Sequence, residues 1–167
     1  MPDPAPVADP DPDRYLGRLG LDAAGGAQPD LPALQRLQRI HVTTVPFETL
    51  AITGDPHGDR DGEGVTLALP HLYEKVVERG RGGYCFELNG PFGWLLRQLG
   101  FDVDRVAARV DDTLPANHHS LVVHLDRPYV VDVGLGGRQL RRPLPLSGEP
   151  VEDEAGVTWR VATLDRP

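Results

Sequence analysis

The stretch that decides the fold is "RGGYCFELNGPFGWLLRQLGFDVDRVAARV", residues 81–110, because its pattern changes from helical to extended. After two glycines, apolar residues recur at helical spacing from Cys85 to Leu99, and Gly100 is a helix stop signal. A strand-like segment begins directly afterwards, at Val103. This order predicts an α+β fold in which the helices come first and the strands second.

The segments on either side fit the same division. Upstream, Asp30 can cap a helix that Pro46 ends, and "LPHLYEKVVERG" (69–80) predicts another helix that stops at Gly80. Downstream, short turns separate apolar runs, and "LDRPYVVDV" predicts a hairpin around Asp126 and Arg127. The predicted strands are 103–110, 119–125, 128–134 and 157–164.

Composition narrows the classes of function. The net charge of −8 and the sequence pI of about 5.1 argue against general binding of nucleic acid or anionic membrane, which needs a basic face. No apolar run approaches the roughly 20 residues that span a bilayer. Residues 1–13 are rich in proline and aspartate, which predicts a disordered acidic tail and no signal peptide. A single cysteine excludes an internal disulfide, so we expect a reducing, cytoplasmic setting.

That one cysteine, Cys85, is either a small buried core residue or a nucleophile. Three features favour the nucleophile. Gly82 and Gly83 leave room for another molecule to approach, and the start of a helix favours a thiolate. Asn89 lies one helical turn further on, where it can donate a hydrogen bond to a reacting carbonyl.

A cysteine nucleophile needs a base and a group that orients the base. In "NHHSLVVHL", His119 alternates with Leu121 and Val123, so we expect it on the buried face and prefer it as the base. Asp132 interrupts an apolar run on the next strand and is costly to bury unless a histidine pairs with it. Alternatively, His119 is structural and Asp132 is a turn residue. Together with Cys85, however, they predict a papain-like Cys-His-Asp arrangement.

At these residues the chain closely resembles the arylamine N-acetyltransferase family. The matching stretches are "VPFETL" (45–50), "RGGYCFELNG" (81–90), "LGFDVDRVAARV" (99–110), "HSLVV" (119–123) and "YVVDVGLGG" (129–137). They occur in the family's order and cover roughly residues 14–147. The arginine-glycine-glycine-aromatic-cysteine signature is the most specific of them.

The resemblance implies a helical bundle, an antiparallel β-barrel domain and a third, α/β domain. We therefore expect a helical domain at 14–100 and an incomplete β-barrel domain at 101–167, with the third domain missing from a truncated chain. The resemblance also implies a catalytic triad of Cys85, His119 and Asp132. Through this triad the enzyme would transfer acetyl from acetyl-CoA, its co-substrate, to an arylamine or arylhydrazine. No bound cofactor and no metal are expected, and the oligomeric state is left open.

The same motifs supply further candidate site residues. The resemblance implies a structural ion pair between Glu48 and Arg81. The group expected to stabilise the tetrahedral oxyanion is either the Asn89 side chain or the Cys85 N–H. Candidate substrate-binding residues are Phe47, Gly134 and Gly136.

Two departures and three alternatives qualify the family reading. Thr49 stands where the family usually has asparagine, and Pro91 falls inside the helix of the cysteine, which it either breaks or bends. The motifs alone do not separate an acetyltransferase from an amide synthase of the same family, which closes macrolactams. A cysteine protease lacks the supporting motifs, and a catalytically idle remnant that only binds a ligand or partner is the alternative from another class.

Overall fold

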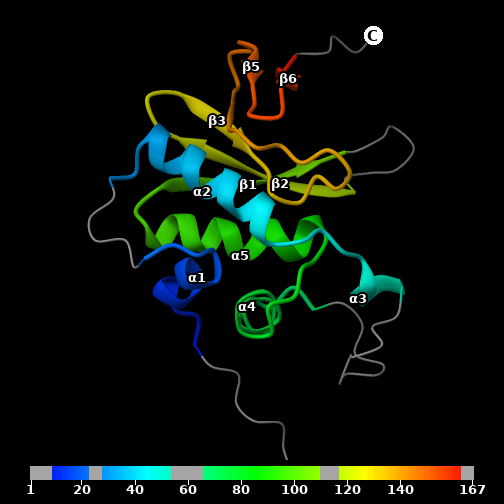
Figure 1. The fold of residues 1–167 in the computed structure, drawn as a ribbon. Helices are drawn as coiled ribbons and strands as arrows, with labels where there is room; N and C mark the ends of the chain where they lie inside the picture. Colours follow the sequence, from blue (N-terminus) through cyan, green and yellow to red (C-terminus); the bar gives the residue numbers. More distant parts are fainter. Residues whose placement is uncertain (1–8, 23–27, 54–65, 110–116, 163–167) are drawn as a thin grey trace, which may run out of the picture.

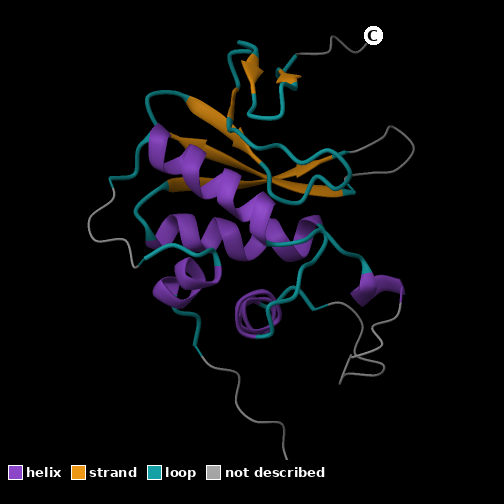
Figure 2. Cartoon of the chain, in the orientation of Figure 1, coloured by secondary structure: helices purple, strands orange, loops and turns teal. Residues whose placement is uncertain are grey.

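The computed structural model describes residues 9–22, 28–53, 66–109 and 117–162. In the view of Figures 1 and 2, the antiparallel sheet and helix α2 (Leu31–Thr44) lie above the long helix α5 (Cys85–Gln98), and α1 (Pro12–Arg18) and α4 (Leu69–Tyr73) lie below it. Helix α5 packs against strands β1 (Asp102–Ala108) and β2 (His118–His124), while α1 and α4 contact its opposite side. The predicted order of helices first and strands second is therefore confirmed.

The helices begin and end where local signals place them. Oδ1 of Asp30 accepts the Ala33 N–H at 2.9 Å and caps α2. Gly100 has φ +89°, and the Phe101 N–H donates to the Leu96 carbonyl at 3.0 Å, which closes α5. The helical elements are α1 (Pro12–Arg18), α2 (Leu31–Thr44), α3 (Leu50–Thr53), α4 (Leu69–Tyr73), the π-helical turn η1 (Glu74–Glu78) and α5 (Cys85–Gln98).

The strands form an open sheet rather than the expected barrel. Four antiparallel strands lie in the order β1-β2-β3-β4, and β5 pairs with β6 as a separate ribbon. The last three strands span two residues each, which is too short to close a barrel within the described part of the chain. The strands are β1 (Asp102–Ala108), β2 (His118–His124), β3 (Pro128–Val131), β4 (Leu144–Pro145), β5 (Val151–Glu152) and β6 (Thr158–Trp159).

The region predicted as an acidic tail is partly helical. Residues 1–8 lie outside the described residues, but α1 begins at Pro12, inside the predicted 1–13 segment. Asp11 caps this helix by accepting the Asp13 N–H at 2.9 Å. The prediction was wrong here because the proline-aspartate run was read as disorder, although Pro at the first helical position after a capping Asp is also a helix start signal.

One hydrophobic core joins the two halves of the chain. It includes Leu34 of α2, Leu88 and Phe92 of α5, and Leu121 and Val131 of the sheet. A domain division at residue 100 stays a prediction, but both sides of that position contribute to this core.

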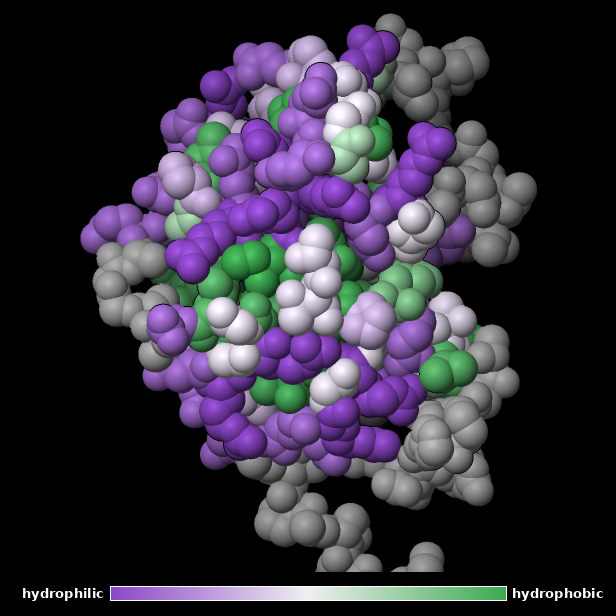
Figure 3. Space-filling model, viewed as in Figure 1, coloured by the Kyte–Doolittle hydropathy of each residue, from purple (hydrophilic) through white to green (hydrophobic). Residues whose placement is uncertain are grey.

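Figure 3 shows a band of hydrophobic residues across the middle of the face seen in Figure 1. Among the described helices, none is both long and apolar enough to cross a membrane.

Candidate functional site

Cys85 is the first residue of α5, and its side chain is buried. Tyr84 precedes it in an extended conformation, and the Tyr84 N–H donates to Oε2 of Glu87 at 3.3 Å. The first N–H groups of a helix have no partner within the helix, and their dipoles favour negative charge nearby. The local sequence thus places the thiol where a thiolate or an oxyanion is stabilised.

A histidine and an aspartate meet this cysteine, but the histidine is His118. Nε2 of His118 lies 2.5 Å from Oδ2 of Asp132, and His118 also hydrogen-bonds the Cys85 side chain. Because a carboxylate only accepts, the ring donates from Nε2 to Asp132, and this bond would also fix the tautomer whenever the ring is neutral. Asp132 is 4% exposed, and its Oδ1 accepts the Gly134 N–H at 2.8 Å. The costly buried carboxylate is thus fully paired.

The prediction that His119 pairs with Asp132 is corrected by the register of the β2–β3 hairpin. Leu121 opposes Val131, so Asp132, one residue further, shares a face with Ser120 and His118. The connecting loop has three residues, 125–127, because the last pair is His124 with Pro128. A two-residue turn, as predicted, would have turned Asp132 to the other face. This register is the signal that sequence reasoning missed.

His119 faces α5 instead. Its ring stacks on Phe86 with the centroids 5.7 Å apart and an interplanar angle of 30°. Nε2 of His119 is buried and has no hydrogen-bond partner among the described residues. The two neighbouring histidines therefore have opposite environments, one in a polar series and one against an aromatic ring.

The two environments shift the histidine pKa values in opposite directions. The hydrogen bonds from His118 to Asp132 and, next, to Cys85 raise the pKa of His118 to about 10, against the cost of burial. Burial, followed by the nearby Arg105 charge, lowers the pKa of His119 below its usual value. At neutral pH, His118 is an imidazolium ion and His119 is neutral.

Asn89 positions the site rather than facing a substrate. Its Nδ2 donates to the His119 carbonyl at 2.7 Å and to Oδ1 of Asp132 at 3.0 Å. Its Oδ1 accepts the Val133 N–H at 2.9 Å. Both amide hydrogens are used, so the expected oxyanion role of Asn89 is not supported by this geometry. The residue instead ties α5 to the ends of β2 and β3.

Atoms of the chain itself occupy the space beside the glycines near the site. A Cβ at Gly82 would lie 1.9 Å from the Pro46 carbonyl oxygen, so the space that we expected for a second molecule is occupied. Phe47 forms a parallel bridge with Gly83, which joins the two motifs directly. A Cβ at Gly134 would lie 2.6 Å from Cα of Cys85. These close approaches, rather than access for a ligand, account for the glycines at these positions.

Phe47 and Gly136 lie together beside this region. Gly136 has φ +80°, and a Cβ added there would lie 3.5 Å from the Phe47 ring. Phe47 is 38% exposed, which is unusual for so large an apolar side chain. An exposed aromatic ring at this position is available for contact with another molecule.

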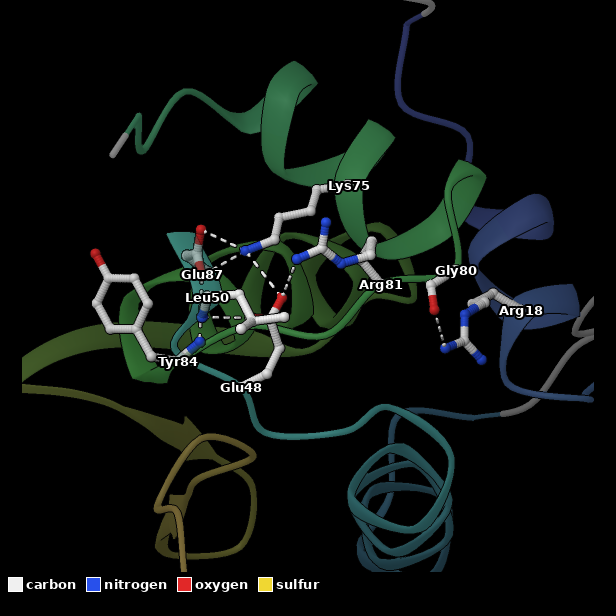
Figure 4. A network of polar contacts seen from close by, with 8 residues as sticks. All are labelled: Arg18, Glu48, Leu50, Lys75, Gly80, Arg81, Tyr84 and Glu87. Carbon is white, nitrogen blue, oxygen red and sulfur yellow. Dashed lines mark hydrogen bonds and ion pairs between the residues drawn. The ribbon is translucent and has the colours of Figure 1, made fainter. Parts of the chain in front are cut away.

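The ion pair expected between Glu48 and Arg81 is present, with Nη2 3.0 Å from Oε1. Sequence reasoning missed a third member, Lys75, whose Nζ lies 3.3 Å from the same oxygen. Lys75 also lies 2.8 Å from Glu87, so the cluster extends to α5 (Figure 4). The pairs are mostly buried and therefore less screened than surface pairs.

A cavity of about 310 Å³ adjoins the two histidines. The sheet contributes Arg105, Val106, Ala107, His118 and His119; α5 contributes Phe86 and Gly90; Leu67, Leu69 and Leu72 complete the lining. The lining is mostly apolar with a few polar groups, as is typical of small-molecule sites. Within the described residues, no group of three His, Cys, Asp or Glu side chains could hold a metal ion.

Pro91 does not break the helix of the cysteine. Helix α5 runs without interruption from Cys85 to Gln98, with Pro91 buried inside it. The proline has no N–H for the Glu87 carbonyl four residues earlier, so that bond is lost. The helix is held by the burial of its apolar side chains on both sides, which offsets the missing bond.

Comparisons with known proteins follow this geometry. A family model of N-acetyltransferases matches residues 30–166. The arylamine N-acetyltransferase of Mycolicibacterium smegmatis is 39% identical over 158 residues, which cover 88% of this chain and 54% of the relative. The N-malonyltransferase FDB2 of Gibberella moniliformis is 39% identical over 132 residues, covering 70% of this chain and 37% of the relative.

Solved structures agree with the sequence matches. The arylamine N-acetyltransferase of Mycobacterium marinum, solved in complex with CoA, superposes with a TM-score of 0.76 at 34% identity, covering 92% of this chain and 57% of that protein. A mixed fold of helices and antiparallel sheet is thus shared with arylamine N-acetyltransferases. The chain belongs to the arylamine N-acetyltransferase family. It spans about half the length of the curated relatives it matches.

Proposed function

We propose that this chain carries the acyl-accepting site of an arylamine N-acetyltransferase, with Cys85 as the nucleophile. The observation that carries the proposal is the hydrogen-bonded series of Cys85, His118 and Asp132 at the first turn of α5. The raised pKa of His118 favours a resting imidazolium beside a thiolate. Asp132 holds the imidazole tautomer, and Asn89 holds Asp132.

Two half-reactions follow from this arrangement. The Cys85 thiolate attacks the carbonyl carbon of acetyl-CoA, and the first N–H groups of α5 stabilise the tetrahedral oxyanion. The CoA thiolate leaves and takes the proton of the His118 imidazolium, which yields acetyl-Cys85. An amine then attacks this thioester, neutral His118 accepts the amine proton, and the Cys85 thiolate leaves as the amide forms. The resting ion pair is restored, so the cycle is ping-pong.

The cavity beside His118 is the proposed place for the ring of the acceptor. Its apolar walls and the Phe86 ring suit an aromatic body, and its 310 Å³ volume suits a small one. Arg105 in its lining adds a positive charge, which favours acceptors with an anionic substituent. Phe47, exposed beside Gly136, is proposed as a second contact for the substrate.

Mass spectrometry tests the first half-reaction directly. The protein is incubated with acetyl-CoA, and we expect a single acetyl adduct on Cys85 that disappears when an arylamine is added. Cys85→Ser is the control and should stay unmodified under the same conditions. Malonyl-CoA is run in parallel, since one relative is named an N-malonyltransferase. No adduct with either donor, in protein that is folded by circular dichroism, would contradict the proposal.

A further inference from the structure

Lys75 is the only lysine in the sequence, and every other residue in the total of 17 lysines and arginines is an arginine. It lies in the π-helical turn η1, and its side chain is 13% exposed. Nζ is 2.8 Å from both carboxylate oxygens of Glu87 and 3.3 Å from Oε1 of Glu48 (Figure 4). A compact ammonium with three N–H donors can bridge two carboxylates in this way, whereas a planar guanidinium needs a different geometry.

The two carboxylates hold the backbone of two segments that meet at Gly83, one that contains Glu48 and one that leads into α5. Oε2 of Glu87 accepts the N–H of Tyr84, the residue directly before Cys85. Oε2 of Glu48 accepts the Leu50 N–H at 2.7 Å, at the start of α3. Figure 4 shows Lys75 between these two groups. The lysine therefore links the segment that bridges Gly83 to the first turn of α5.

The charges of this cluster have a consequence for the thiol. Glu87 is in the first turn of α5, two residues after Cys85, so an uncompensated carboxylate there would oppose a thiolate. Glu48 and Glu87 carry two negative charges, and Lys75 and Arg81 carry two positive charges. Among the described residues these four groups carry no net charge together, and removal of the lysine charge leaves the four positions with one net negative charge.

We propose that Lys75 is a positioning residue that, together with Arg81, balances the charges of the Glu48 and Glu87 carboxylates beside the first turn of α5, so that Cys85 can carry negative charge. The proposal rests on the proposed function only in taking Cys85 as the nucleophile. It adds a reason for the chain's one lysine to lie in a buried turn, 10 residues before the cysteine.

The test is the pH dependence of iodoacetamide alkylation, which needs neither acetyl-CoA nor an acceptor. Because the chain has one cysteine, the total rate reports Cys85 alone. Lys75→Met should raise the pH midpoint of alkylation by about one unit, which is roughly a tenfold lower rate well below the midpoint. Lys75→Arg should recover most of the loss, because the positive charge is kept.

A double variant separates charge from structure. Lys75→Met with Glu87→Gln makes the cluster neutral again, and the Gln oxygen can still accept the Tyr84 N–H, so the midpoint should return towards the wild-type value. If the lysine served packing only, the double variant would be no better than Lys75→Met. That result, or an unchanged midpoint in Lys75→Met, overturns the proposal.

Two further variants complete the design. Glu87→Gln alone leaves one net positive charge and should lower the midpoint, so the proposal stays testable if Lys75→Met does not fold. Arg14→Met removes a cation from an exposed pair with Glu78 and should change nothing. The midpoint differences between variants test Lys75, whereas a missing acetyl adduct in wild-type protein would contradict the proposed function. The two failures are therefore distinguishable.

Discussion

Replacing His118 by alanine should suppress the reactivity of Cys85 near pH 6, whereas replacing His119 should not. The proposed function requires the imidazolium of His118, whose pKa is raised to about 10, to stabilise negative charge on the sulfur. Without it, an ordinary thiol with a pKa of about 8.5 is roughly 0.3% thiolate at pH 6, a loss of about 300-fold in the reactive form. A less stabilised thiolate is intrinsically more nucleophilic, which recovers about tenfold. The expected net fall in alkylation rate is about 30-fold.

The assay is the second-order rate of iodoacetamide alkylation at pH 6, followed by the mass of the protein. His119→Ala should stay within about twofold of wild type, because its ring contacts Phe86 and not Asp132. His124→Ala is the matched control on the same strand, since that side chain is exposed and pairs with Asp104. A large loss in His119→Ala with none in His118→Ala would refute the hairpin-register argument and restore the assignment made from the "HSLVV" motif.

Three further outcomes test other parts of the site. Asn89→Ala should lower the free energy of unfolding in urea by about 2–4 kcal/mol, because three hydrogen bonds, two of them buried, lose a partner; the exposed Gln98→Ala should cost under about 0.5 kcal/mol, and equal losses would contradict the inference that Asn89 ties α5 to β2 and β3. Gly134→Ala places a Cβ 2.6 Å from a backbone atom of α5 and should lower both the melting temperature and the alkylation rate, whereas Gly137→Ala, with open space around it, should leave both unchanged. Burial lowers the pKa of His41 to about 3, so only the unfolded state gains a proton below about pH 6.5; stability should therefore fall as the pH falls, by about 2 kcal/mol at pH 5, and His41→Gln should abolish that component in urea titrations at pH 7 and pH 5.

The parts of the fold that were predictable from sequence are those set by local signals. Helices α2 and α5 have a capping Asp30 and a closing Gly100, and their apolar periodicity is long enough to identify. Strands β4 and β5 have two residues each, too few to show any period, and tertiary packing alone makes them strands, whereas β6 lies inside the predicted strand segment 157–164. The open sheet could not be distinguished from a barrel for the same reason.

In the candidate site, too, the residues marked by their local sequence were predictable, and those that depend on tertiary structure were not. Cys85 and Asp132 stood out because each is chemically unusual in its own segment. The choice between two adjacent histidines depends on the register of a hairpin, which a difference of one loop residue reverses. Lys75 lies 27 residues from Glu48 and 12 from Glu87, and only the folded chain shows that one ammonium group reaches both.

The three-residue loop between β2 and β3 has a consequence at the level of the gene. Insertion or deletion of a single codon there would shift the register of β3 on β2 by one residue. Asp132 would then lie on the same face of the sheet as His119 instead of His118. The same shift would turn Val131, which opposes Leu121 in the core, to the other face of the sheet. The core therefore constrains the length of this loop as strictly as the site does, and we expect a one-codon change to unfold the hairpin rather than to exchange the histidines.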